Sequence, residues 1–123
     1  LLDDAVNVED LIFDTDQRGL SVLGAGRRDD NATELLASRR MRELVQTMRR
    51  RDPHRIVLFD SSPLLITTES RELGEIASQI VLVVKAGTTP RQSVYDALDM
   101  FAEDKSIGLV LNRASRTASD GEY

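Results

Sequence analysis

Short apolar runs recur along the chain at intervals that leave room for a helix or a turn between them. The clearest runs occupy 56–59, 80–84 within the stretch 79–85, and 107–111, and a weaker one occupies 20–23. Unbroken runs of this length, rich in β-branched residues and ended by turn residues, are typical of strands that are covered on both faces. The pattern therefore predicts four strands, three of them strongly marked.

Helical spacing fills most of the gaps between these runs. Apolar residues at the helical period predict helices over about 34–51, 68–77 and 90–103. Residues 1–13 are expected to form a short helix or an irregular amphipathic segment, and 115–123 a flexible tail without apolar periodicity. Each predicted helix begins at a capping signal, namely Asn31 with Glu34, Thr67 or Thr68, and Thr89 followed by Pro90.

The alternation of strand and helix predicts the fold class. Strands separated by helices form a parallel sheet joined by right-handed crossovers, so successive strands point the same way. We therefore expect an α/β fold with a mostly parallel sheet flanked by helices. Polar residues that end successive strands then gather along one edge of the sheet, where α/β proteins bind their ligands. In this sequence those residues are Asp60, Lys85 to Gly87, and Asn112.

Asp60 is the main candidate for chemistry. It ends the apolar run 56–59 and precedes a Ser-Ser-Pro turn. A P-loop nucleotidase holds the acid that positions its magnesium ion at such a strand end, directly or through water. The alternative is that Asp60 only caps the turn, since Asp and Ser favour such positions. The convergence of strand ends at one edge favours the functional interpretation.

The Gly24-Ala25-Gly26 sequence is the nearest approach to a phosphate-binding loop. It is followed by Arg27 and Arg28, and neither a third glycine nor a Gly-Lys-Ser/Thr sequence comes after it. A dinucleotide-binding or Walker A interpretation therefore fails, and we interpret the two glycines as a turn that ends a strand.

Composition excludes several classes of site. The 123 residues include no cysteine and one histidine, which excludes disulfides and thiolate metal sites and makes a catalytic triad improbable. The formal net charge of −5 argues against a nucleic-acid partner. No apolar run approaches the length of a membrane span, and nothing at the start resembles a signal peptide. These features are compatible with a cytoplasmic protein.

The predicted helix 34–51 carries a cluster of basic residues opposite its apolar side. Such a cluster binds phosphates, lipid headgroups or an acidic partner in other proteins. Glu34 and Glu43 are interspersed with it and the chain is acidic overall, so a solvated helix face is the alternative that we favour from sequence. The cluster consists of Arg39, Arg40, Arg42, Arg49, Arg50 and Arg51.

Four blocks of sequence carry a resemblance to a known family. The blocks NATELLASRRMRELVQTM, RIVLFDSSPLL, QIVLVVKAGTTPRQSVYDAL and GLVLNRA occur here in this order. Together they resemble the second half of the catalytic domain of bacterial tyrosine autokinases (BY-kinases), which control exopolysaccharide synthesis and export. The similarity is greatest to the branch associated with exosortase and PEP-CTERM systems. The resemblance implies that 1–114 form the C-terminal half of a P-loop kinase domain, a partial MinD- and ParA-like fold, and that 115–123 are its tail.

The resemblance also implies roles for individual residues. In this family the γ-phosphoryl group of ATP passes to a tyrosine hydroxyl while Mg²⁺ neutralises phosphate charge. Asp60 is similar to the Walker B aspartate, which helps to position the metal and accepts the tyrosine proton. Asn112 resembles the residue that meets the adenine edge, and Arg113 would border the base. Tyr123 matches the start of the family's tyrosine cluster and would be a phosphoacceptor.

Two departures from the family pattern limit these expectations. The chain contains no Walker A loop, and no lysine in it can replace the lysine of that loop. Ser62 also stands where many relatives have proline. We therefore expect ATP and Mg²⁺ to be cofactors of the full-length parent and to bind this chain poorly or not at all.

Further expectations concern assembly and alternatives. The strand 55–60 lacks its usual neighbour, so we expect either a homo-oligomer formed through that edge or a rearranged strand order. A polysaccharide co-polymerase or membrane activator is the expected partner of the parent, at the inner face of the membrane. Two alternatives remain open: a non-catalytic interaction module of a polysaccharide export system, and a fragment of a MinD- or ParA-like ATPase.

Overall fold

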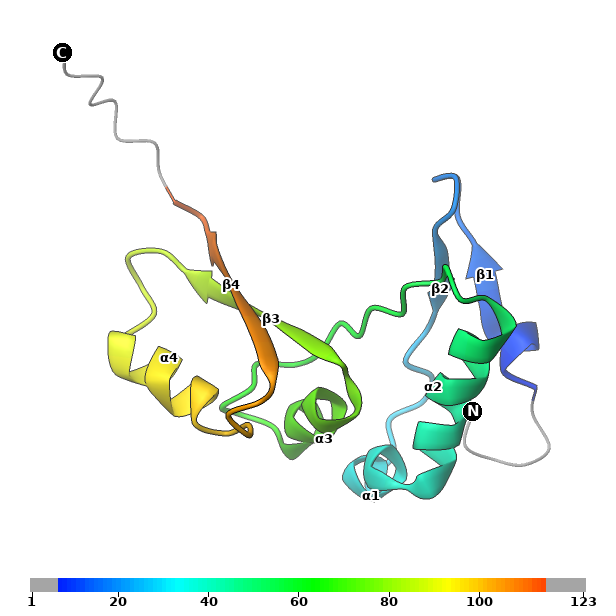
Figure 1. The fold of residues 1–123 in the computed structure, drawn as a ribbon, viewed down its shortest axis with the longest axis horizontal. Coiled ribbons are helices and arrows are strands. Elements are labelled where there is room, and N and C mark those ends of the chain that lie inside the picture. The colour runs from blue at the N-terminus through cyan, green and yellow to red at the C-terminus, as the bar shows by residue number, and fades with distance from the viewer. Residues whose placement is uncertain (1–6, 115–123) are drawn as a thin grey trace, which may run out of the picture. The chain divides into compact units, whose positions relative to one another are not determined.

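The structure, a computed structural model, describes residues 7–114 and divides the chain into two compact units, Leu1–Phe59 and Asp60–Tyr123. Each unit contains one two-stranded sheet and two α-helices (Figure 1). The predicted α/β composition with parallel strands is confirmed. The larger, mostly parallel sheet is not present among the described residues, because one of the two sheets is antiparallel and neither exceeds two strands.

The sheet of the first unit is an antiparallel hairpin that the sequence pattern did not predict. A 3₁₀ turn, η1 (Val8–Leu11), leads into β1 (Ile12–Asp14), which pairs with β2 (Ser21–Leu23). Gly19 closes the connecting turn with a φ of +81°, a value that glycine adopts without a steric penalty. The expected strand at 20–23 therefore exists, but its partner is the segment expected to be helical or irregular.

Ser38 divides the long helix predicted over 34–51 into two. The helices are α1 (Ala32–Ala37) and α2 (Arg39–Arg51), and Ser38 between them is extended, with a ψ of 156°. Its hydroxyl donates a hydrogen bond to the Leu35 carbonyl at 2.6 Å and accepts one from the Met41 amide at 3.2 Å. One serine side chain thus satisfies backbone groups at the end of one helix and the start of the next.

The second unit is a β-α-β crossover preceded by a helix. Its elements are α3 (Thr68–Ile76), β3 (Gln79–Lys85), α4 (Arg91–Leu98) and β4 (Ser106–Asn112). β3 and β4 pair in parallel along their full length, from Gln79 opposite Ser106 to Lys85 opposite Asn112. The two strongest strand predictions are therefore confirmed.

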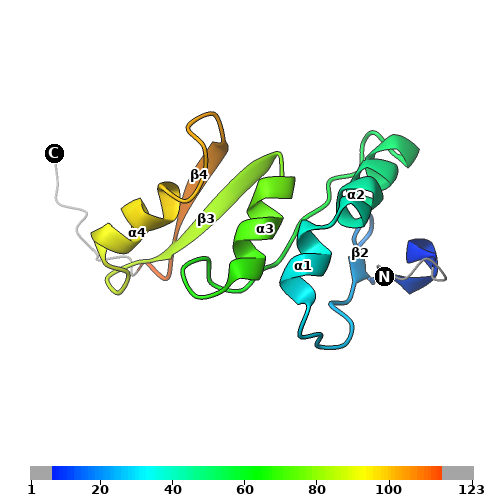
Figure 2. The same ribbon diagram turned by 90° about the horizontal axis from the view of Figure 1, so that it is seen from below.

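Helices cover one face of the parallel pair (Figures 1 and 2). Alternate residues of β3 are half-buried beneath α3 and α4, whereas Val81 and Val83 are 65% and 59% exposed. In α3, a Cβ atom added at Gly74 would lie 2.5 Å from Cε1 of Phe101 and 3.5 Å from Cδ1 of Ile80. Glycine at this position therefore allows the loop after α4 and the start of β3 to pack closely on the helix.

The strand predicted over 56–59 is not present. These residues have no regular structure, and the side chains of Ile56 and Leu58 are 83% and 84% exposed. Among the described residues, no backbone hydrogen bond joins this segment to another strand. An apolar run adopts strand structure only where a neighbouring strand pairs with its N–H and C=O groups, and none of the four described strands pairs with it.

Two details of α4 also differ from expectation. Pro90, rather than Thr89, is the residue that precedes the helix, and the Thr89 hydroxyl instead accepts a hydrogen bond from the Lys85 amide at 3.2 Å. The helix ends at Leu98 rather than near Glu103, because the chain turns there. Thr89 thus closes the loop after β3 instead of capping a helix.

Candidate functional site

The candidate site is the carboxyl edge of the β3–β4 sheet. Lys85 and Asn112 are register partners at the last position of the two strands, as the sequence pattern predicts. The Ala86 amide donates to the Asn112 carbonyl at 2.9 Å, which extends the pairing by one residue. The loop from Lys85 to Thr89 and the turn at Asn112 therefore lie side by side at this edge.

Asn112 and Arg113 have a local geometry that sequence reasoning did not anticipate. The Asn112 side-chain oxygen accepts a hydrogen bond from the Arg113 amide at 2.8 Å. Arg113 has a φ of +57°, and it is the one described non-glycine residue with a positive φ. Such a conformation costs a non-glycine residue about 1 kcal/mol or more, and residues of this kind cluster at functional sites.

Asp60 does not reach this edge on a strand. It is exposed, and its carboxylate makes no hydrogen bond or ion pair with another described residue. The expected delivery of Asp60 by a paired strand is therefore not seen, because 56–59 have no strand partner.

Ser70 holds the loop that follows Asp60, and nothing in the sequence pattern singled it out. Its side chain is 4% exposed. Its hydroxyl donates to the Ser62 carbonyl at 2.7 Å and lies 2.8 Å from the hydroxyl of Thr67, the residue that precedes α3. A Ser-Ser-Pro turn followed eight residues later by a helical serine is the only signal that the sequence offers for this contact.

The direction of α3 decides toward which end of the sheet this loop lies. Gly74, in the carboxyl half of α3, lies next to Ile80 at the start of β3. α3 therefore runs back along the strand that follows it, and its amino end is directed toward the end of the sheet where β3 stops (Figure 2). Because Ser70 binds the loop after Asp60 to that amino end, the loop lies toward the Asn112 side of the sheet rather than the opposite one.

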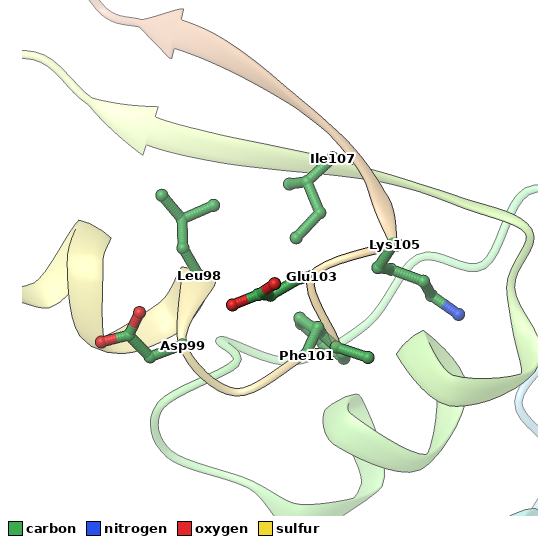
Figure 3. A pocket seen from close by; sticks show the side chains of 7 residues that line it. Leu98, Asp99, Phe101, Glu103, Lys105 and Ile107 are labelled. Carbon is green, nitrogen blue, oxygen red and sulfur yellow. The ribbon is translucent and has the colours of Figure 1, made fainter.

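A separate hollow occupies the other end of the same sheet. It has a volume of about 540 Å³ and lies where α4 ends and β4 begins (Figure 3). Leu98 and Ile107 project toward it, and the Glu103 carboxylate is drawn among the side chains of Leu98, Asp99 and Phe101. Lys105 is at its edge and donates from Nζ to the Glu75 carbonyl at 3.2 Å. This hollow is at the amino end of β4, so it is distinct from the site predicted at Asn112. Its lining residues are Leu98, Asp99, Phe101, Ala102, Glu103, Lys105 and Ile107.

Tyr123 lies outside the described residues, so its expected role stays a prediction. Tyr95 is 54% exposed on α4.

No helix among residues 7–114 is both long enough and apolar enough to cross a membrane.

Comparisons of sequence and of structure both find similarity to bacterial kinases. No family model matches the chain. The chain is 29% identical over 119 residues to the tyrosine-protein kinase YwqD of Bacillus subtilis, a match that covers 95% of this chain and 49% of that protein. It is 26% identical over 121 residues to the tyrosine-protein kinase ptk of Acinetobacter johnsonii, covering 97% of this chain and 16% of that protein.

Solved structures extend the similarity to the fold. The kinase domain of VpsO matches with a TM-score of 0.80 and 28% identity, covering 93% of this chain and 56% of that one. The tyrosine kinase domain of BceF matches with a TM-score of 0.75 and 29% identity, covering 89% and 46%. The chain thus spans half or less of the curated relatives it matches. By sequence and by fold, the chain is similar to part of the kinase domain of bacterial tyrosine kinases.

Proposed function

We propose that this chain is the part of a protein tyrosine autokinase that supplies the base-binding and metal-positioning side of its nucleotide site. In the full-length parent, the γ-phosphoryl group of ATP would pass to a tyrosine hydroxyl, and this activity would regulate exopolysaccharide synthesis and export. The observation that carries the proposal is the pairing of Lys85 with Asn112 at the carboxyl edge of a parallel sheet, in a chain whose relatives are named tyrosine kinases.

Each candidate residue has a defined role in this proposal. Asp60 has a carboxylate without a partner among the described residues, so it is available to hold Mg²⁺ or to accept the tyrosine proton. The Asn112 oxygen is occupied by the Arg113 amide, which leaves the NH₂ group to donate to a ring nitrogen of adenine. Arg113 would border the base. Tyr123 would receive the phosphoryl group.

The residues of this chain are suited to hold the Mg²⁺ ion of Mg-ATP but not its phosphates. Mg²⁺ is commonly bound by one or two carboxylates together with phosphate oxygens, so a single aspartate is an adequate protein ligand. No group of three or more metal-ligating side chains occurs in residues 7–114. The phosphates themselves require a glycine-rich loop with a lysine, which this sequence does not contain. We therefore assign no catalytic step to this chain alone and expect it to bind Mg-ATP weakly.

The proposed assembly and location rest on the kinase assignment. The backbone of residues 56–60 pairs with no strand among the described residues, which favours association with another copy of the chain or with a strand of the parent. A polysaccharide co-polymerase or membrane activator would hold the parent at the inner face of the membrane. Charge argues against nucleic acid as a partner.

Phosphoryl transfer in the full-length parent tests the function. Asp60→Asn should lower the rate of tyrosine phosphorylation about 100-fold or more, the usual effect of removing a general base or metal ligand. Asp16→Asn is the matched control, because Asp16 is an exposed aspartate in the β1–β2 turn and should leave the rate unchanged. Equal rates in the Asp60 variant and the parent would refute the assignment.

A non-catalytic interaction module is the second candidate, because the sequence lacks a phosphate loop. The flanking genomic sequence separates the two candidates. A Gly-Lys-Ser/Thr loop upstream with further tyrosines downstream supports the kinase, whereas their absence supports the module. A MinD- or ParA-like ATPase would have the loop but no reason for a tyrosine at the position of Tyr123.

A further inference from the structure

The polar face of α2 has arginines that the kinase assignment does not use. Fourteen of the sixteen basic residues of the chain are arginines, and six of these lie on α2. Arginine presents a planar fork of donors that binds phosphate through two parallel hydrogen bonds, which lysine cannot do. The arginines of α2 are therefore suited to bind an oxyanion.

Ion pairs distinguish two groups among five of these arginines. Arg39 is paired with Glu43 at 2.6 Å, a contact that raises the pKa of Arg39, and Arg51 is paired with Glu9. In contrast, Arg42, Arg49 and Arg50 are exposed and have no acidic partner within the described part of the chain. The protein is acidic overall, so acids were available to neutralise this face.

Helical geometry places the unpaired arginines together. Residues three, four and seven positions apart lie on one face of a helix, so Arg42, Gln46, Arg49 and Arg50 form a single stripe. A shallow pocket of about 370 Å³ opens at its carboxyl end, lined by Gln46, Arg49, Arg50 and Pro53. The pocket is open to solvent, so it offers room for a compact anion to contact these side chains without enclosing it. Its lining contains no acid and includes a side-chain amide as an additional donor.

The helix dipole does not account for the whole stripe. The partial negative charge at a helix carboxyl end stabilises cations in the last turn, which gives Arg49 to Arg51 a structural reason to be there. Arg42 lies two turns earlier, beyond the range of this effect. Its position in line with the pocket requires another explanation.

We propose that the stripe of Arg42, Gln46, Arg49 and Arg50 is a binding site for a phosphate monoester. Three uncompensated guanidinium groups match a doubly charged phosphate better than a singly charged carboxylate. A lipid bilayer fits less well, because an interfacial helix inserts its apolar side, and here that side is packed in the protein, with Met41 only 8% exposed. A phosphorylated side chain and a free phosphorylated metabolite share the required chemistry.

NMR titration of the full chain with phenyl phosphate tests the proposal. We expect saturable shifts of the amides of α2, and at least a tenfold weaker affinity in Arg49→Gln/Arg50→Gln. Arg27→Gln/Arg28→Gln is the matched control, since it removes an adjacent pair of arginines from a loop of the same unit, and it should bind like the unmodified chain. Arg49→Lys/Arg50→Lys preserves charge and should still bind more weakly than the unmodified chain, because lysine lacks the fork.

Further titrations distinguish a protein-bound phosphate from a metabolite, and specific binding from non-specific or membrane binding. A phosphopeptide that binds more tightly than phenyl phosphate identifies a protein ligand, and the reverse identifies a metabolite; either result supports the site. Equal loss in the Arg27/Arg28 control indicates non-specific attraction and overturns it. Binding to phosphatidylglycerol vesicles without binding to phenyl phosphate also overturns it, in favour of a membrane surface. Circular dichroism of each variant verifies that it is folded.

Discussion

Replacing Gly74 by alanine tests the packing that joins α3 to the sheet below the candidate site. The added Cβ would lie 2.5 and 2.6 Å from two ring carbons of Phe101, well inside van der Waals contact. Gly→Ala in a helix interior normally stabilises a protein by about 0.5–1 kcal/mol. Overpacking costs about 1–3 kcal/mol, because side chains or backbone must move. The two effects together predict a net loss of about 1 kcal/mol.

A second substitution isolates the clash. In a Phe101→Leu background, the shorter side chain vacates the position of the two ring carbons. There Gly74→Ala should become neutral or stabilising by up to about 1 kcal/mol. Urea unfolding followed by circular dichroism gives the free energy of unfolding of each of the four proteins. The comparison is valid if the four proteins share the same m-value, the slope of this free energy against urea concentration. If Gly74→Ala raises the stability of the unmodified chain, then α3 and Phe101 do not pack as described.

Three further substitutions test individual contacts. Ser70→Ala should lower the free energy of unfolding by about 1 kcal/mol and increase amide hydrogen exchange in the loop after Asp60, because a buried hydroxyl loses two hydrogen bonds. Ser78→Ala, at an exposed serine, is the control and should change neither quantity. Ser38→Ala should lower the thermal midpoint through loss of about 1 kcal/mol of capping, and an unchanged midpoint would show that the hydroxyl does not cap α2. Arg113→Gly should be about 1 kcal/mol more stable than Arg113→Ala, since only glycine accepts a positive φ freely; equal stabilities would contradict the assigned backbone.

Local signals predicted the second unit well. The runs at 79–85 and 107–111 were confirmed as parallel strands, because both the apolar period and the turn residues are local properties of the chain. The same signals predict that Lys85 and Asn112 lie at one edge of the sheet, and the strand register confirms it. The side-chain contact between Asn112 and the Arg113 amide depends on a backbone angle that residue identity does not reveal.

The apolar pattern does not predict three other features of the fold, for a different reason in each case. The run at 56–59 has the composition of a buried strand, but strand formation needs a partner, and the sequence pattern cannot show which partner is present. The helix over 34–51 kept its period across Ser38, so nothing local predicted that the serine would bond in both directions. The β1–β2 hairpin was missed because its strands have three residues each, too short to show alternation.

Titration of the chain with Mg-ADP and Mg-ATP, followed by amide NMR, tests the central claim most directly. That claim is that the chain carries the base side of a nucleotide site and not its phosphate cradle. We expect weak binding, with dissociation constants of roughly millimolar order, and shifts confined to Asn112, Arg113, the loop from Lys85 to Thr89 and the turn that begins at Asp60. Micromolar binding that Asp60→Ala abolishes, or shifts that leave Asn112 and Arg113 unchanged, would contradict it.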